Sequence, residues 1–432
     1  MIKLKMYNGK NPPINGFNYA PFVFPESWVG YHIKDLFKVR GGRPISRNNM
    51  SNTGVACLHY GDIHTTTDLS LNVIKQYDSL PKVKDNQYKN SDLLQHGDVI
   101  FADASEDYAG VAKSLVIENK ENRKMIAGLH TVVASIKNNE VNGLYRRYMF
   151  SNWLVRKQLM FFAQGISVYG ISKTNIENTV LVLPPFLEQK KIAEILSTWD
   201  EAIDLQTKLI NEKKVFLSNL ALSLVKNHKS LVNFESSWGR VSLFDVYAER
   251  KEYGYQDENF ELYSLTIEDG VTAKTNRYNR EFLVKGDKKK YKITKYHDLV
   301  FNPQNLRYGA IALNYNQCPI LLSPIYATLY IKDQNKYDVE YFNFLLTSQE
   351  MINYYDSIAE GTLIERMTVK PKIFLKQEFN IPPIEEQRKI SMMLIEMRNE
   401  ISILEKELEL KKLQKQGLMQ QLLTGKIRVN IK

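Results

Sequence analysis

The 432-residue sequence lacks the features that several classes of protein require. It has two cysteines, Cys57 and Cys318, which lie far apart and provide neither a disulfide framework nor a CxxC pair. A reducing cytoplasm is therefore the expected compartment. No apolar run approaches bilayer length, and the N-terminus, which is interrupted by lysines, has no signal-peptide core. These absences argue against a membrane protein and against a disulfide-rich secreted protein.

Motifs for cofactor chemistry are incomplete. Gly425-Lys426 lacks the upstream glycine of a phosphate-binding loop, so we do not expect the chain itself to use ATP. Asn11-Pro12-Pro13-Ile14 differs from the N-P-P-aromatic motif of amino-methyltransferases, because Ile14 replaces the aromatic residue and no glycine-rich cofactor loop accompanies it. A turn-rich leader explains this segment better.

Candidate catalytic or metal-binding groups are equally sparse. His59, Asp62 and His64 lack the i, i+4 histidine spacing of a helical zinc site, and a loop with polar side chains is the stronger interpretation. Glu118-x-Lys120 is a fragment of a nuclease-like pair that any charged chain contains by chance. No Ser-His-Asp or Cys-His arrangement can be assembled. The sequence therefore predicts a protein that is not itself an enzyme and that binds no metal or cofactor.

The composition is that of an ordinary globular protein with excess positive charge. Apolar residues make up 44% of the chain and charged residues 25%, and the length suggests two or three domains. The net charge of +10 favours a polyanionic partner, although charge alone is a weak signal.

One segment of the sequence occurs twice. Leu183 to Ile192 (LPPFLEQKKI) returns as Ile381 to Ile390 (IPPIEEQRKI), an offset of 198 residues from Pro184 to Pro382. Each copy follows a globular-looking stretch of similar length. An internal duplication of this kind predicts two equivalent binding units and suits a ligand with two spaced sites.

Both copies open a long helical segment with alternating three- and four-residue apolar spacing, which is typical of a coiled-coil seam. The first seam comprises Ile192, Leu196, Trp199, Ile203, Gln206, Ile210, Lys213, Leu217, Leu220 and Leu224. The second comprises Ile390, Leu394, Met397, Ile401, Leu404, Leu408, Lys411, Lys415, Leu418 and Leu422. The matching seams favour an intramolecular antiparallel pair, and pairing between chains also fits them.

The helix ends carry terminal signals. Proline pairs suit a helix start, Glu188 and Glu385-Glu386 fall in the first turn where the helix dipole favours acids, and Gly425 stands where a left-handed cap is expected. Helices of about 35 to 40 residues span about 50–60 Å at 1.5 Å per residue. That length exceeds the roughly 34–36 Å of one DNA turn, so the pair could hold two readers over successive major grooves.

The regions that precede the two long helices share weaker sequence similarity. Ser27-Trp28 corresponds to Ser237-Trp238, and Gly97 to Phe101 corresponds to His297 to Phe301 at an offset of 200. Strands are expected at Thr131 to Ile136 and Ile325 to Ile331, and helices at Tyr145 to Phe162 and Val339 to Tyr355. The predicted fold is α+β, with two tandem pseudo-symmetric domains, each followed by a long helix, and with the two helices pairing as an antiparallel coiled coil.

The tandem PP-x-x-E-Q-x-K-I openings, the Ser-Trp starts and the closing Leu422 to Ile427 resemble the specificity subunit of type I restriction-modification systems. The resemblance runs from about Phe22 to the C-terminus, and the leader Met1 to Ala20 has no matching repeat. It implies five segments: a leader at 1–20, target-recognition domains at 21–182 and 234–380, and conserved helical regions at 183–233 and 381–432.

The resemblance also implies partners. Each recognition domain would read one half of a bipartite sequence in double-stranded DNA, and the helices would set the spacer and dock methyltransferase subunits, probably two in number. S-adenosylmethionine, ATP and Mg²⁺ would be bound by the methyltransferase and restriction subunits. The DNA target itself depends on loop placement and DNA shape, which sequence does not give.

Candidate DNA-reading residues combine arginine, lysine and amides in loops. In the first domain they are Arg40, Arg43 and Arg47 in an arginine-glycine turn, and Tyr169, Ser172 and Lys173 near the glycine at 165. In the second they are Arg250, Lys251, Asn302, Gln304, Asn305, Arg307, Tyr308 and Arg366. Lys288, Lys289 and Lys290 would touch phosphates, because a lysine run carries no sequence information.

Two other hypotheses compete with that of a recognition subunit. A self-contained DNA-modifying or DNA-cleaving enzyme with a dispersed active site is the main alternative, and the missing cofactor loop argues against it. A purely structural scaffold does not explain two large domains that differ between their matched elements.

Overall fold

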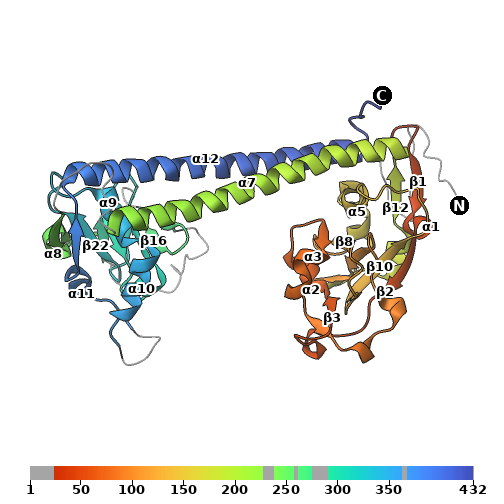
Figure 1. The fold of residues 1–432 in the computed structure, drawn as a ribbon, viewed down its shortest axis with the longest axis horizontal. Helices are drawn as coiled ribbons and strands as arrows, with labels where there is room; N and C mark the ends of the chain where they lie inside the picture. The colour runs from red at the N-terminus through yellow and green to blue at the C-terminus, as the bar shows by residue number, and fades with distance from the viewer. Residues whose placement is uncertain (1–23, 227–237, 257–260, 275–289, 362–366, 432) are drawn as a thin grey trace. The chain divides into compact units, whose positions relative to one another are not determined.

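The structure is a computed structural model that describes residues 24–226, 238–256, 261–274, 290–361 and 367–431. The chain divides into two compact units. Unit 1 contains residues 1–205 and 408–432, and unit 2 contains residues 206–407. Each unit has one globular domain and one stretch of each of two long helices (Figure 1). Among the described residues, no helix combines the length and apolar composition needed to cross a bilayer.

The globular domain of unit 1 contains two main sheets. The larger sheet has the order β2 (Phe37–Gly41), β10 (Thr131–Ile136), β6 (Val99–Ala102), β8 (Ser114–Glu118) and β4 (Ser70–Asn72). Its neighbours are antiparallel except β4 and β8. The smaller sheet has the order β5 (Lys82–Val83), β3 (Val55–Leu58) and β9 (Met125–Ala127). The buried strands β3 and β6 read as continuous apolar runs because both of their faces are covered.

Short elements complete unit 1. Two strand pairs join β1 (Val29–His32) to β12 (Val180–Leu183) and β7 (Ala104–Ser105) to β11 (Tyr169–Gly170). The helices are α1 (Ile33–Leu36), α2 (Tyr60–Thr65), α3 (Val73–Gln76), α4 (Arg146–Met149), α5 (Trp153–Phe161) and α6 (Lys173–Asn178).

Unit 2 repeats this plan with fewer strands among its described residues. Its larger sheet has the order β14 (Tyr247–Glu249), β22 (Ala327–Ile331), β19 (Leu299–Phe301) and β20 (Ile311–Leu313). Its smaller sheet has the order β15 (Tyr253–Tyr255), β18 (Lys290–Thr294) and β21 (Ile320–Leu322). The strand pairs are β13 (Gly239–Ser242) with β23 (Glu378–Ile381) and β16 (Tyr263–Thr266) with β17 (Gly270–Ala273). The helices are α8 (Leu243–Val246), α9 (Val339–Leu346), α10 (Gln349–Ser357) and α11 (Pro371–Leu375).

Three local predictions differ from the structure. The expected helices at 145–162 and 339–355 are each divided in two, because the Asn152 and Ser348 side chains accept hydrogen bonds from the backbone and cap a new helix. The segment from His59 to His64 is mostly the helix α2 rather than a loop. His59 and Asp62 form a capping box at its start, which explains the helix.

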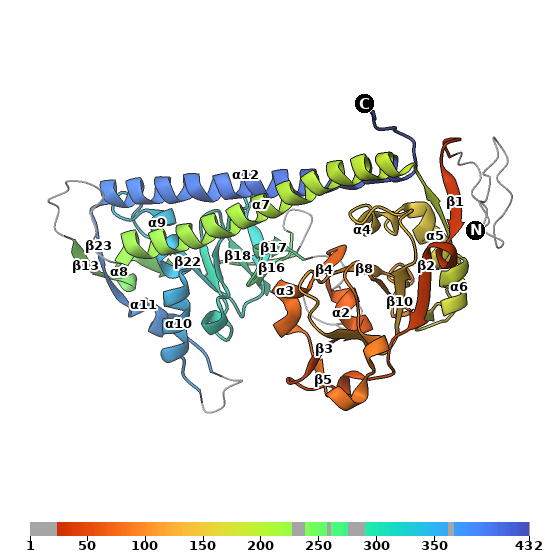
Figure 2. The same ribbon diagram turned by 45° about the vertical axis from the view of Figure 1, so that its right-hand side comes forward.

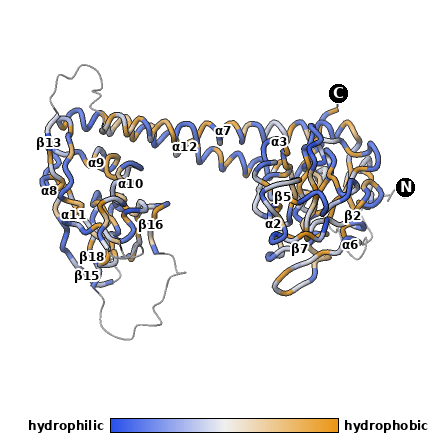
Figure 3. The backbone as a smooth tube through the Cα atoms, turned by 60° about the horizontal axis from the view of Figure 1, so that its bottom comes forward, coloured by the Kyte–Doolittle hydropathy of each residue, from blue (hydrophilic) through white to orange (hydrophobic). Residues whose placement is uncertain are grey.

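The two long helices are α7 (Phe186–Lys226) and α12 (Ile384–Leu423). Within each unit they lie antiparallel, and apolar and polar residues alternate along both (Figures 2 and 3). Every residue of the predicted seams is buried or half-buried, and in unit 2 the Gln206 side chain donates a hydrogen bond of 2.8 Å to the Leu404 carbonyl. Gly425 follows α12 with φ of 73°, which confirms the predicted left-handed cap.

Candidate nucleic-acid interface

The repeated glutamine fixes each globular domain to its long helix. Gln189 Oε1 accepts a hydrogen bond of 2.8 Å from the Asn142 backbone, and Gln189 Nε2 donates to the carbonyls of Glu140 and Pro184. Gln387 makes the same three bonds to Asp338, Lys336 and Pro382. The side chain satisfies backbone groups that the helix start and the domain would otherwise leave unpaired. This network gives a physical reason for the glutamine that recurs in the repeated sequence motif.

The glutamate before the first glutamine is also buried. The Glu188 carboxylate is fully inaccessible and accepts hydrogen bonds from Trp28 Nε1 at 3.2 Å and from Arg428 at 2.6 and 2.8 Å. Arg428 lies beyond α12, so the C-terminal segment closes unit 1 against its N-terminal side. The sequence predicts the position of Glu188 in the first helical turn from the helix dipole alone and does not predict this buried ion pair.

The arginine turn of unit 1 is held by its own domain. Gly42 donates to the Thr131 carbonyl at 2.8 Å, and a Cβ there would lie 2.1 Å from Thr131 Oγ1, so the close approach requires glycine. Arg40 donates to the carbonyls of Asp92 and Leu93, and Arg43 pairs with the Asp92 carboxylate. Arg47 makes a bidentate bond to Asp62 and keeps about half of its side chain exposed, at 52%. Of the three arginines, Arg47 is the most available to a ligand.

The second candidate segment of unit 1 forms a hairpin and a helix start. Tyr169 lies in β11 and meets Tyr108 edge-to-face, with 5.3 Å between ring centroids. Ser172 caps α6 by accepting from the Asn175 backbone, and Lys173 pairs with Glu177 at 3.5 Å. Ser172 therefore has a structural role, whereas Tyr169 and Lys173 lie at the surface of the hairpin base.

The first candidates of unit 2 differ in accessibility. Arg250 makes two hydrogen bonds of 2.6 and 2.8 Å to the buried Asp298 carboxylate and stacks on Tyr330. Burial raises the pKa of Asp298 even though this arginine favours its ionised form. Lys251 is exposed. Arg250 consequently braces the sheet, and its neighbour Lys251 faces solvent.

The amide-rich turn of unit 2, residues 302–308, also contains both buried and exposed candidates. Asn302 is buried and accepts from the Gln304 backbone, and the Arg307 guanidinium contacts Asp356, Met367 and the Tyr308 hydroxyl. Gln304, Asn305 and Tyr308 are exposed on the turn. The structure thus brings Gln304, Asn305 and Tyr308 together at one surface and places Asn302 and Arg307 beneath it.

The remaining candidates are only partly described. Lys290 begins β18 and is exposed beside the Tyr255 ring, 5.9 Å from its centroid. Arg366, Lys288 and Lys289 lie outside the described residues, as does the leader 1–20.

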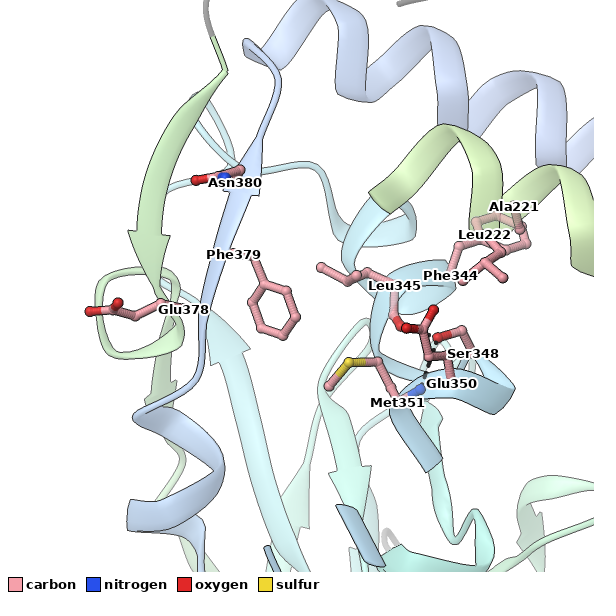
Figure 4. Close-up of a pocket in the computed structure, with 10 residues that line it drawn as sticks. All are labelled: Ala221, Leu222, Phe344, Leu345, Ser348, Glu350, Met351, Glu378, Phe379 and Asn380. Atoms are coloured by element: carbon pink, nitrogen blue, oxygen red, sulfur yellow. Dashed lines mark hydrogen bonds between the residues drawn. The ribbon is translucent and has the colours of Figure 1, made fainter. Parts of the chain in front are cut away.

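Two surface features were not predicted. Ile166 and Val168 form the exposed apolar tip of the hairpin that ends in β11, and although they lie in the candidate stretch 165–173, neither residue was named as a contact. Unit 2 contains an apolar pocket of about 260 Å³ between the end of α7, α9, α10 and β23 (Figure 4). It is lined by Ala221, Leu222, Phe344, Leu345, Ser348, Glu350, Met351, Glu378, Phe379 and Asn380, none of which is a predicted DNA contact.

The described side chains include one buried thiol, Cys57, and one exposed thiol, Cys318. Within the described ranges, no three His, Cys, Asp or Glu residues gather in a way that could hold a metal ion. Burial raises the pKa of the Cys57 thiol to about 12, which disfavours the reactive thiolate. Exposed amides, tyrosines and basic residues on turns are instead suited to contacts with base edges and phosphates.

The comparisons with known proteins agree with this chemistry. Residues 25–214 match the family model described as "Type I restriction modification DNA specificity domain". The chain is 24% identical over 441 residues to a candidate MjaX type I restriction enzyme specificity subunit of Methanocaldococcus jannaschii, covering 94% of this chain and 95% of that protein. It is 27% identical over 327 residues to the MjaVIII specificity subunit of the same organism, covering 68% of this chain and 72% of that protein.

A solved structure shares the fold. It is described as "Structural basis underlying complex assembly and conformational transition of the type I R-M system", and one of its chains aligns with a TM-score of 0.61 at 15% identity. The alignment covers 94% of this chain and 100% of that one. This likeness shows a shared fold. The two relatives show that the chain is similar in sequence, over 68% and 94% of its length, to type I restriction enzyme specificity subunits, and residues 25–214 are similar to their DNA specificity domain.

Proposed function

We propose that the chain is the DNA-reading, non-catalytic subunit of a type I restriction-modification complex that recognises a bipartite sequence. Residues 21–182 read one half-site and residues 234–380 read the other. The observation that carries this proposal is the duplication of the Gln189 and Gln387 networks, because it gives two domains the same attachment to a helix. Two equivalently mounted readers suit a target with two spaced halves.

The helical regions 183–233 and 381–432 would dock the methyltransferase subunits, which methylate adenine. Apolar side chains remain exposed on the outer faces of the helices in both units. They are Leu205, Leu410 and Leu413 in unit 1, and Leu209, Phe216 and Ile403 in unit 2. Exposed apolar side chains on regular helices favour a protein partner. The partners, including nuclease-translocase subunits for cleavage, would bring S-adenosylmethionine, ATP and Mg²⁺.

Mapping of methylated adenines tests the whole proposal. Cells that contain the methyltransferase partner are compared with and without this chain. We expect a bipartite motif of methylated adenines that disappears when the chain is deleted. The purified chain alone should show neither methyltransferase nor nuclease activity, and robust turnover by a highly pure preparation would contradict the proposal.

The spacer between half-sites provides a second test. The helix α7 runs without interruption across Leu205, where unit 1 gives way to unit 2. Four residues inserted there add about 6 Å of helix, close to the rise of two base pairs, and nearly preserve the helical face. The half-sites should stay unchanged while the gap lengthens by about one or two base pairs. A changed half-site with an unchanged gap would show that the helices do not set the spacing.

A further inference from the structure

A hairpin on unit 1 carries an apolar tip that the protein leaves in solvent. The Ile166 side chain is 94% exposed and Val168 is 57% exposed. Phe161 and Tyr108 are exposed on the neighbouring elements. Single apolar residues at a surface are common, but an almost fully exposed isoleucine at the end of a hairpin gains nothing from the folded protein.

The hairpin is nevertheless firmly built. The backbones of Gln164 and Gly170 exchange two hydrogen bonds, of 2.9 and 2.7 Å, across its base. Gly165 has φ of 138°, and a Cβ at this position would lie 1.9 Å from the Val168 carbonyl oxygen, so only glycine fits the turn. The exposed tip is therefore held in a defined place by its backbone.

A second set of contacts braces the hairpin from below. The Tyr108 hydroxyl donates to the Met160 carbonyl at 2.7 Å, and its ring packs edge-to-face on Tyr169 at the hairpin base. Arg156 donates to the carbonyls of Ala109, Val111 and Ala112 and so fixes the turn that carries Tyr108. A wedge needs such preorganisation to act on a ligand without losing its own order.

Unit 2 has a hairpin base of the same construction. Glu360 and Thr368 exchange backbone hydrogen bonds of 3.0 and 2.9 Å, as Gln164 and Gly170 do. The Val369 backbone donates to the Pro303 carbonyl at 2.9 Å, which matches the bond of 2.9 Å from Ile171 to Asp103 in unit 1. The sequence between the paired residues contains Leu363-Ile364, which lies outside the described residues. Among the described residues, the two units therefore share the same arrangement of hydrogen bonds at this base.

We propose that the hairpin from Gln164 to Gly170 inserts Ile166 between two base pairs of double-stranded DNA, next to the half-site that unit 1 reads. This inference rests on the proposed function and adds a contact to it. Aliphatic side chains pushed between base steps partly unstack them and bend the duplex, which gives specificity through the flexibility of that step.

Three observations favour DNA over a protein as the occupant. The hairpin base contains Tyr169 and leads to Lys173, both candidate DNA contacts, and the match to a DNA specificity domain includes the whole hairpin. The apolar tip is one or two side chains wide, whereas a stable protein interface buries about 1,000 Å² or more. The chain also has a net charge of +10, which draws it to a polyanion.

The test uses the full chain with its methyltransferase partner. A random duplex library first yields the bipartite target, and duplexes with 2-aminopurine at successive positions then report unstacking as increased fluorescence. The methylated adenine is left out, since a methyltransferase itself extrudes that base. With the native chain, we expect the fluorescence of 2-aminopurine to increase at one base step beside the half-site of unit 1. With Ile166→Ser, the fluorescence at this step should not increase, and the variant should bind the duplex about tenfold more weakly.

Two variants sharpen the result. Ile74→Ser changes an exposed isoleucine on α3 of the same unit and should keep the signal. Gly165→Ala distorts the turn and should abolish the signal while the half-site sequence stays the same. An equal increase in 2-aminopurine fluorescence with the native chain and with Ile166→Ser overturns the proposal. The proposal is also overturned if Ile166→Ser keeps the fluorescence increase but no longer co-elutes with the methyltransferase, because the tip would then contact a protein. Failure of the native chain to select any bipartite target would instead overturn the proposed function.

Discussion

Units 1 and 2 attach their domains to the long helices with opposite charges. In unit 1, Asp200 on α7 accepts a hydrogen bond of 2.6 Å from the buried Tyr148 hydroxyl and pairs with Lys415 on α12. In unit 2, the position 198 residues later is Arg398 on α12, which contacts Glu340 at 3.4 Å and the Tyr315 hydroxyl at 3.2 Å. The backbone plan is the same, and the sign of the charge on the helix is reversed.

This difference separates what the fold requires from what it tolerates. The Gln189 and Gln387 networks are identical because they satisfy backbone groups whose positions the fold determines. Asp200 and Arg398 bind side chains, which can change in concert as long as each charge keeps a partner. Contacts to side chains are therefore free to diverge between duplicated units, and the surface that meets DNA should diverge most.

Exchange of a whole domain should give the largest effect. Replacing residues 22–182 with the corresponding domain of a relative should change one half of the methylated motif completely and leave the other half intact, since the two readers are mounted separately. Methylation mapping of the chimera measures both halves at once. A change in both halves together would show that the units do not read independently.

Removal of the arginine that pairs with a buried carboxylate should strongly destabilise one unit. Arg428→Met removes the cationic partner of the buried Glu188 side chain, and we expect a loss of about 3 kcal/mol in the free energy of unfolding of unit 1. Hydrogen exchange resolved along the chain should show weaker protection in unit 1 and unchanged protection in unit 2.

Arg388→Met is a matched control, because Arg388 and Arg428 are both 45% exposed, but the partner of Arg388, Glu385, is itself at the surface. We expect the control to cost less than about 1 kcal/mol. Equal losses for the two variants would mean that the burial of Glu188 does not strengthen the pair.

The sequence predicted periodic and repeated features better than individual contacts. The seams, the strand at Thr131 to Ile136 and the cap at Gly425 depend on local spacing, which a single sequence displays. The buried pairs of Glu188 with Arg428 and of Arg250 with Asp298 join residues 240 and 48 positions apart, and nothing local marks them. For the same reason, the sequence predicts Arg250 and Arg307 as DNA contacts, whereas in the structure both side chains are largely buried and pair with acidic residues of their own domain.

The repeated glutamines should contribute equally in the two units. Gln189→Ala and Gln387→Ala each remove three hydrogen bonds to backbone groups, and we expect each to cost about 2 kcal/mol. Denaturant unfolding followed by hydrogen exchange should place each loss in its own unit. Gln414→Ala, at an exposed position of α12, should have no measurable effect. A large difference between the two glutamine variants would contradict the equivalence of the attachments.

The smallest effects are expected at the charged contacts that differ between the units. Asp200→Asn and Arg398→Gln each weaken partly exposed contacts and should cost about 1 kcal/mol. Arg398 and Glu340 contact each other, so their effects should not add. The double variant Arg398→Gln, Glu340→Gln should therefore lose less free energy of unfolding than the two single variants lose together. Asp200→Asn combined with Glu340→Gln, which joins separate contacts in separate units, should instead be additive. Urea unfolding of the three single variants and the two double variants distinguishes these outcomes. Additivity of the Arg398 and Glu340 changes would mean that the ion pair does not hold the domain of unit 2 to α12.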